Sequence, residues 1–201
     1  MHLDQAGVEQ ATALRDRLRA VPLSAAVTSP LERTVQTTDL VLADRAVPIH
    51  RDDRVGECQY GDWTGGQLKT LEKEPLWRVV QAHPSAVVFP GGESIAQMQH
   101  RSVTAIRDWN DRLGADAVYV VVSHGDIIKA VLADALGMHL DHYQRLQVDP
   151  CSVSVIDYTP LRPFVLRVND IGGDLAGLAP SRPKRRRRRT SDAVVGGGAG
   201  R

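Results

Sequence analysis

The segment 118–122 constrains the fold of this chain more than any other. It contains four valines and one tyrosine, so an extended strand here is β-branched at four of five positions and apolar on both faces. Strands of this kind are typical of parallel sheets, whose two faces are both covered by helices. We therefore expect an α/β fold in which helices cover both faces of the sheet that contains this strand.

Helical and extended patterns alternate along the rest of the chain. Asp4 and Ser94 each precede apolar residues at helical spacing and are suited to cap a helix. Ser29 stands before a proline and a glutamate, a pattern that predicts a helix running to about residue 43. Four further extended segments are expected, at 25–28, 47–49, 153–158 and 164–168. The alternation predicts a three-layer α/β/α domain with a mostly parallel sheet over residues 1–178.

The charges divide the chain into a mildly acidic domain and a basic tail. Residues 179–201 hold eight of the 25 basic and one of the 24 acidic residues, which leaves 17 basic and 23 acidic residues in 1–178. This balance argues against a nucleic-acid-binding domain. A run of arginines followed by glycines cannot pack, so we expect 179–201 to be disordered. The tail is either a solvated extension or a contact for RNA or an anionic membrane through Arg185–Arg189.

Several other classes of protein are also disfavoured. No window approaches the roughly 18 consecutive apolar residues of a membrane span, and no basic-then-apolar leader is visible at the start. Cys58 and Cys151 are too few for a disulfide framework. The histidines lack metal-ligand spacing, and no glycine-rich nucleotide fingerprint is present. We expect a cytoplasmic protein without a membrane span, metal or cofactor.

Candidate reactive residues follow two of the expected strands, where the carboxyl ends of a parallel sheet collect ligand-binding groups. Arg33 lies in the first turn of the helix after 25–28, where a guanidinium beside free backbone N–H groups suits a phosphate. The alternative is a surface arginine paired with Glu32 or Asp39. His124 directly follows 118–122 and is placed either to contact an anion and relay a proton or to be satisfied by the backbone of the turn.

A carboxyl group is the third candidate. Glu57 opens a glycine-rich loop, and shielding by Tyr60 and Trp63 would raise its pKa and suit it as a general acid. The alternative is a solvated loop glutamate. Glu93 is a weaker candidate for the same role, and Asp126 is expected to serve at a helix start.

Five short stretches connect these candidates to a known family. The stretches are His2-Leu3-Asp4-x-x-Gly7, Thr28-Ser29-Pro30-Leu31-x-Arg33, Glu57-x-x-x-Gly61-Asp62-Trp63-x-Gly65, Pro90-Gly91-Gly92-Glu93-Ser94 and Val122-Ser123-His124-Gly125. In this order along residues 2 to about 172, they resemble the motifs of the histidine phosphatase superfamily, also called the phosphoglycerate mutase-like family, and within it the actinobacterial branch labelled as phosphomutases.

The resemblance implies a phosphatase or phosphomutase that acts on a small phosphate monoester without a metal or nucleotide. A histidine nucleophile would form a phosphohistidine, which water or an acceptor hydroxyl resolves. Carried over by motif, Arg33 is the second arginine that holds the phosphoryl oxygens, His124 is the second histidine, and Glu57 donates a proton to the leaving group. Trp63, Trp77 and Tyr60 either line the substrate pocket or pack in the core.

One family motif has no match. The nucleophile of the family belongs to an Arg-His-Gly motif on the first, central strand of the sheet, and this triplet does not occur in the 201 residues. His2 matches a surface position and is no substitute. We expect the native start to lie upstream, so that this sequence is N-terminally truncated and lacks that strand. The alternative is a catalytically inactive pseudophosphatase that binds phosphoesters or a protein partner.

Overall fold

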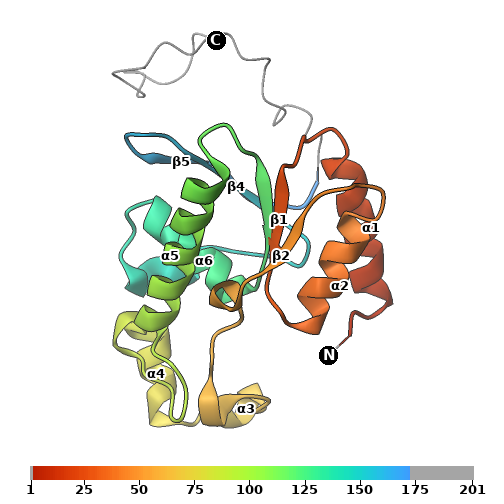
Figure 1. Ribbon diagram of the computed structural model, residues 1–201. Coiled ribbons are helices and arrows are strands. Elements are labelled where there is room, and N and C mark those ends of the chain that lie inside the picture. Colours follow the sequence, from red (N-terminus) through yellow and green to blue (C-terminus); the bar gives the residue numbers. More distant parts are fainter. Residues whose placement is uncertain (1, 173–201) are drawn as a thin grey trace.

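A three-stranded parallel sheet lies at the centre of the computed structural model, which describes residues 2–172 (Figure 1). The strand order is β2 (Ile49–Arg51), β1 (Ala25–Thr28) and β3 (Tyr119–Val122). Both pairings are parallel, and Val27 of β1 lies opposite His50 on one side and Val121 on the other. The expected parallel sheet is confirmed, and the carboxyl ends of β1 and β3 lie at the same edge.

Helices cover both faces of this sheet. Successive side chains of β1 point to opposite faces, so neighbouring residues of β1 contact different helices. Ala26 is fully buried in a cluster with residues of α1 (Gln5–Leu18) and α2 (Glu32–Val41). Val27 is fully buried in another cluster, with Ala105 and Trp109 of α5 (Ile95–Leu113). The expected three-layer α/β/α arrangement is therefore confirmed, with α1 and α2 on one side and α5 on the other (Figure 1).

Two of the three expected helix caps form. Asp4 Oδ1 accepts a hydrogen bond from the Gly7 amide (2.8 Å) at the start of α1, and Ser94 makes a complete capping box with Gln97 at the start of α5. The expected cap at Ser29 is wrong, because α2 begins at Glu32 with Leu31 as its N-cap. The Ser29 hydroxyl lies instead in a buried contact with the His124 ring.

The C-terminal part of the described chain forms a separate antiparallel sheet. It consists of β4 (Val153–Tyr158), as expected, and β5 (Pro163–Asp170), which extends beyond the expected 164–168. Helix α6 (Gly125–Ala135) packs against both strands. The remaining elements connect the layers: α3 (Leu68–Leu71), α4 (Pro75–Ala82) and four short 3₁₀ helices, η1 (Asp53–Val55), η2 (Gly61–Trp63), η3 (Pro84–Ala86) and η4 (Leu140–Arg145).

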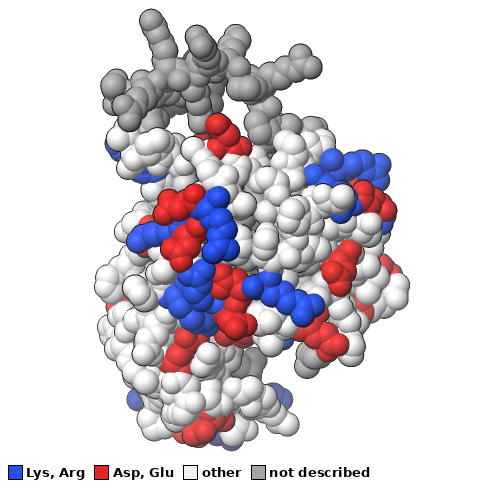
Figure 2. Space-filling model, in the orientation of Figure 1, with Lys and Arg blue, Asp and Glu red and all other residues white. Residues whose placement is uncertain are grey.

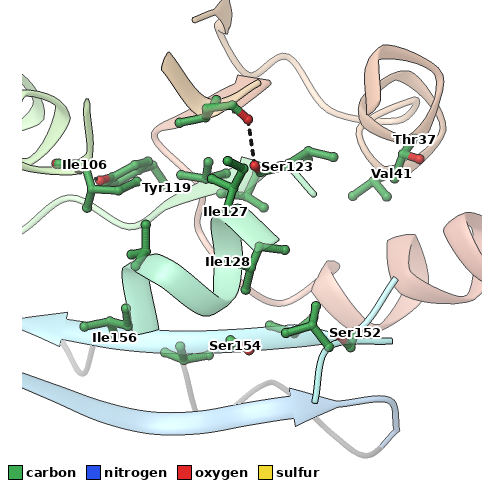
Figure 3. A pocket seen from close by; sticks show the side chains of 18 of the residues that line it. Thr37, Val41, Ile106, Tyr119, Ser123, Ile127, Ile128, Ser152, Ser154 and Ile156 are labelled. Carbon is green, nitrogen blue, oxygen red and sulfur yellow. Dashed lines mark hydrogen bonds between the residues drawn. The ribbon is translucent and has the colours of Figure 1, made fainter. Parts of the chain in front are cut away.

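A cavity of about 1630 Å³ separates the two sheets, and we call it the slot. Within residues 2–172, no strand pairing joins β3 to β4, and both strands line the slot. Figure 3 shows side chains of α2, α6 and β4 around it. Most of the helical side chains that line it are apolar, including Leu14, Leu18, Val41, Ile127, Ile128 and Val131.

Strand β3 is less buried than its apolar composition suggests. Its four residues are all half-buried, although this is the most apolar strand of the chain. The reason is that β3 pairs with β1 along one edge and faces the slot along the other. The strand therefore lies at the edge of the parallel sheet rather than inside it.

Charged side chains of both signs are interspersed on the face seen in Figure 2. Many of them form ion pairs, such as Arg54 with Asp52 (2.8 Å) and Arg107 with Asp134 (3.1 Å). In residues 2–172, no helix is long and apolar enough to cross a membrane. The expectations for the 179–201 tail and for Arg185–Arg189 concern residues that lie outside the described part of the chain.

Candidate active site

Three side chains predicted from the sequence meet at the carboxyl ends of β1 and β3. Arg33 lies in the first turn of α2, which follows β1, and His124 is the N-cap residue of α6, which follows β3. Glu57 comes from the loop after η1. Parallel neighbouring strands end at the same edge of a sheet, which is why residues 91 positions apart come into contact.

The contacts among the three are short. Arg33 Nη2 donates to His124 Nδ1 at 2.9 Å and lies 3.4 Å from Glu57 Oε2. The distance from His124 Nδ1 to Glu57 Oε2 is 3.6 Å. Arg33 therefore contacts the two other predicted site residues, and the ring nitrogens of His124 contact side chains, Arg33 and Ser29, rather than the backbone of the turn.

The protonation of His124 follows from its partners. A guanidinium only donates hydrogen bonds, so Nδ1 acts as acceptor and the neutral ring carries its proton on Nε2. From there it donates to Ser29 Oγ at 2.8 Å. Burial lowers the pKa of His124 to about 4, and the charges of Arg33 and Arg101 act in the same direction. At neutral pH the ring is uncharged, with Nδ1 turned toward Arg33 and Glu57.

Burial shifts the pKa of Glu57 in the opposite direction from that of His124. Burial raises the pKa of its carboxyl, and the nearby Asp126 adds to the effect, while the Cys58 amide and the charges of Arg33 and Arg101 oppose it. The Cys58 N–H donates to Oε1 at 3.0 Å. The side chain is 27% exposed, so the carboxyl can exchange protons with a molecule at the site. A carboxyl with a raised pKa in reach of a cation is suited to general acid catalysis.

Glu93, the weaker candidate, does not join this cluster. Burial alone would raise its pKa, but hydrogen bonds from Arg101 and the Gln59 amide outweigh that effect and hold the pKa below its ordinary value. Such a carboxyl is a poor proton donor. Asp126 lies in the first turn of α6, as expected, and accepts a hydrogen bond from the Tyr60 hydroxyl at 2.9 Å.

The aromatic side chains proposed as pocket residues form a cluster of their own. Trp63 stacks with Trp77 (6.2 Å between ring centroids) and contacts Phe89 edge-on (5.5 Å). Tyr60 also contacts Phe89 edge-on, with 5.2 Å between the ring centroids. Tyr60 and Trp63 pack against the core cluster that contains Phe89, and none of these aromatic residues lines the slot.

Two residues next to the site were missed by sequence reasoning. Ser29 looked like a helix cap, yet its fully buried hydroxyl partners His124. Arg101, on α5, donates to the backbone of the loop that carries Glu57. Nothing in the sequence distinguishes Arg101 from the other arginines of that helix, because the backbone carbonyls to which it donates belong to a segment more than 40 residues away.

The cluster lies at one end of the slot. Arg33, Glu57, Ser123 and His124 line the slot together with the apolar side chains of β3 and α6. Arg33 supplies a permanent positive charge there, and the N-terminus of α6 begins at the same point. The arrangement can hold an anion against a protonated carboxyl. Within the described residues, no group of three or more His, Cys, Asp or Glu side chains is arranged to hold a metal ion.

Comparison with known proteins identifies the family. The model of the histidine phosphatase superfamily (branch 1) matches residues 1–171. The chain belongs to this superfamily. The family expected from the sequence motifs is thereby confirmed, as is its fold.

Individual members of the superfamily resemble the chain over most of its length. Phosphoserine phosphatase 1 of Hydrogenobacter thermophilus is 30% identical over 169 residues, which cover 83% of this chain and 80% of that protein. A Proteus mirabilis protein named "Probable phosphoglycerate mutase GpmB" is 27% identical, over 76% of this chain and 71% of its own. Among solved structures, Bacillus stearothermophilus YhfR has a TM-score of 0.79 at 27% identity and covers 85% of both chains.

Proposed function

We propose that this chain is a metal-independent phosphatase or phosphomutase that acts on a small phosphate monoester. The observation that carries the proposal is the contact of Arg33, His124 and Glu57 at the carboxyl ends of two parallel strands. In this proposal Arg33 and His124 hold the phosphoryl group, and Glu57 donates a proton to the leaving oxygen. Membership in the histidine phosphatase superfamily supports this assignment.

In this proposal the nucleophile is a histidine on a further strand, not contained in the 201 residues, that would fill the slot. Three features support this part of the proposal: the slot has an apolar lining, it lies between β3 and β4, and it ends at the cluster. A strand that enters the slot parallel to β3 ends beside Arg33 and His124, because parallel strands share one carboxyl edge. An Arg-His-Gly segment at the end of that strand supplies the nucleophile and a second arginine.

The chemistry requires two displacements at phosphorus. In the first, a ring nitrogen of the nucleophilic histidine forms a bond to phosphorus while the bond to the leaving oxygen breaks, and the Glu57 carboxyl gives its proton to that oxygen. In the second, water or an acceptor hydroxyl attacks phosphorus, its proton passes to Glu57, and the phosphorus–nitrogen bond breaks. A hydroxyl acceptor gives a mutase and water gives a phosphatase; the relatives bear names of both kinds.

Charge stabilisation by the cluster accounts for much of the rate enhancement. Arg33 is always charged, whereas His124 is neutral before a ligand binds because burial lowers its pKa to about 4. A phosphate dianion brings the opposite charge into the site and raises the pKa of His124. Arg33 Nη2 then transfers its hydrogen bond from His124 Nδ1 to the phosphate, and Nδ1 takes up a proton and donates it in a hydrogen bond to a phosphoryl oxygen. Phosphate binding is therefore coupled to proton uptake.

The test uses two forms of the protein: the 201-residue chain and a strand-extended protein, in which an apolar strand ending in Arg-His-Gly precedes Met1 through a Gly/Ser linker. We expect the strand-extended protein to hydrolyse phosphoserine and an aryl phosphate in the presence of EDTA. The matched control carries Gln in place of the histidine of the added strand and should be inactive. The amides of Tyr119 and Val121 point away from β1, because Val122 and Val118 turn their backbone groups toward it, so protection of these two amides from hydrogen exchange reports whether the added strand occupies the slot.

Two results would overturn the proposal. The first is an added strand that protects β3 but gives no turnover; phosphate binding that depends on Arg33 would then favour the pseudophosphatase alternative. The second is turnover that survives the histidine-to-Gln replacement in the added strand, which would remove the nucleophile assignment.

A further inference from the structure

Arg101 makes an unusually complete set of hydrogen bonds with the loop that carries Glu57. Its Nη1 donates to the carbonyl oxygens of Arg54 (2.7 Å) and Gly56 (2.9 Å), and its Nη2 donates to the carbonyl of Glu57 itself (3.0 Å). The other two donors form a fork with Glu93, at 2.9 Å from Nε and 2.6 Å from Nη2. All five N–H groups of the guanidinium are used.

Glu93 extends the same network to the far side of Glu57. Its Oε1 accepts from the Gln59 amide (2.9 Å), and its own amide donates to the Gln59 carbonyl (2.9 Å). The pair of Arg101 and Glu93 therefore binds the backbone just before Glu57, at Glu57 and two residues after it. Both side chains are mostly buried, at 19% and 11% exposure.

The loop needs such support because it contains little regular structure. Residues 56–60 belong to no helix or strand, so no ladder of backbone hydrogen bonds fixes their position. The Glu57 carboxyl is nevertheless held within 3.6 Å of both Arg33 and His124. Few contacts of Glu57 come from its neighbours in sequence, apart from the Cys58 amide on Oε1.

We infer that Arg101, braced by Glu93, is a positioning residue that holds Glu57 in place for proton donation. This inference rests on the proposed function, since proton donation by Glu57 is part of that proposal. Arg101 acts through the backbone of the loop and does not reach the phosphoryl group. A planar guanidinium with five fixed donors is required, and a lysine, with three donors on a single nitrogen, cannot reproduce the geometry.

The first measurement needs no catalysis and uses the 201-residue chain. Arg101→Lys keeps the positive charge but loses the fork. We expect hydrogen exchange of the Cys58 amide, which reports whether the Glu57 carboxyl is seated, to become about tenfold faster. The matched control is Arg107→Lys, because Arg107 lies on the same helix and forms an ion pair with Asp134 away from the loop. Unchanged exchange at Cys58 in Arg101→Lys would overturn the inference.

The second measurement separates positioning from a general structural role. In the strand-extended protein, Glu57→Gln should reduce hydrolysis of an alkyl phosphate about 100-fold and leave a dinitrophenyl phosphate almost unaffected, because a good leaving group needs no proton. Arg101→Lys should follow the same pattern with about a tenfold loss on the alkyl substrate. The double variant Arg101→Lys/Glu57→Gln should hydrolyse the alkyl phosphate no more slowly than Glu57→Gln alone.

The outcomes distinguish the inference from the proposed function. Equal losses on both substrates, or a further loss in the double variant, would overturn the positioning role. Absence of turnover in the strand-extended protein would instead contradict the proposed function. The exchange measurement at Cys58 would then decide by itself whether Arg101 holds Glu57 in place.

Discussion

Strands β1 and β3 are hydrogen-bonded neighbours with very different surroundings. Every residue of β1 is buried, whereas every residue of β3 is half-buried, although β3 is the more apolar of the two. β1 lies between two strands and under helices on both faces, while β3 has the slot on its other side. An apolar sequence therefore shows that a strand can be buried, but the elements packed around the strand determine how far it is buried.

The difference also separates stability from function. The region around β1, where Ala26 and Val27 are fully buried, is a filled core, and we call it the packed side; α1 and α2 contribute to this core and also present Leu14, Leu18 and Val41 to the slot. The region around β3 contains the slot and, at its end, Arg33, Glu57 and His124. Substitutions on the packed side should mainly change the free energy of unfolding, and substitutions at the end of the slot should mainly change phosphate binding and turnover.

The largest expected effect contrasts two arginines. In the strand-extended protein, Arg33→Met should lower kcat/KM about 1000-fold, because it removes the permanent charge that faces the transferred phosphoryl group. Arg45→Met is the matched change on the packed side, where Arg45 donates to the carbonyls of Leu18 (2.9 Å) and Val21. It should lower the free energy of unfolding by about 1–3 kcal/mol and leave kcat/KM within a few-fold. The reverse pattern would remove the distinction between the two sides.

The next effect is a pH dependence of stability. The pKa of His124 is about 4 when folded, against 6.5 as its ordinary value, so the unfolded chain binds the extra proton between these values. The contribution of the neutral His124 ring to the free energy of unfolding is present above pH 6.5 and is lost as the pH falls toward 4. Between pH 7 and 5, urea unfolding of the 201-residue chain should lose about 2 kcal/mol that His124→Gln does not lose.

Two features make this measurement interpretable. The raised pKa of Glu57 acts with the opposite sign, favouring the folded state at low pH, and that carboxyl is present in both proteins. His100→Gln replaces an exposed histidine of α5 and should behave like the unsubstituted chain. Equal pH dependence in His124→Gln and the unsubstituted chain would show that His124 is not buried in its neutral form.

The smallest effect compares two valines that face each other across the β1–β3 pairing. Val27→Ala should lower the free energy of unfolding of the 201-residue chain by about 2 kcal/mol, since Val27 is fully buried. Val121→Ala should cost about 1 kcal/mol or less, because Val121 is half-buried. In the strand-extended protein the cost at Val121 should rise toward that at Val27. Equal costs in the 201-residue chain would contradict a hollow slot.

Much of the architecture could be predicted because it depends on local patterns. The cap at Asp4, the capping box at Ser94 and the strands at 25–28 and 153–158 follow from residues close together in sequence. The grouping of Arg33, Glu57 and His124 was also accessible, since the first and last follow strands of one parallel sheet and family motifs mark all three.

The errors and omissions share a physical cause. The cap at Ser29 was wrong because its hydroxyl has a partner 95 positions away, and local spacing does not show that partner. Arg101 was missed because backbone carbonyls, which carry no sequence signal, are among its main acceptors. The half-buried state of β3 depends on which strands pair with it, and composition alone does not report pairing.

The most direct test of the account is to locate the phosphoryl group during turnover. The strand-extended protein is mixed with phosphoserine, quenched rapidly at alkaline pH to preserve phosphohistidine, and mapped by mass spectrometry. The account predicts phosphohistidine on the added strand, at a level that falls sharply in Arg33→Met. A phosphoryl group on His124, or on no residue while turnover continues, would contradict it.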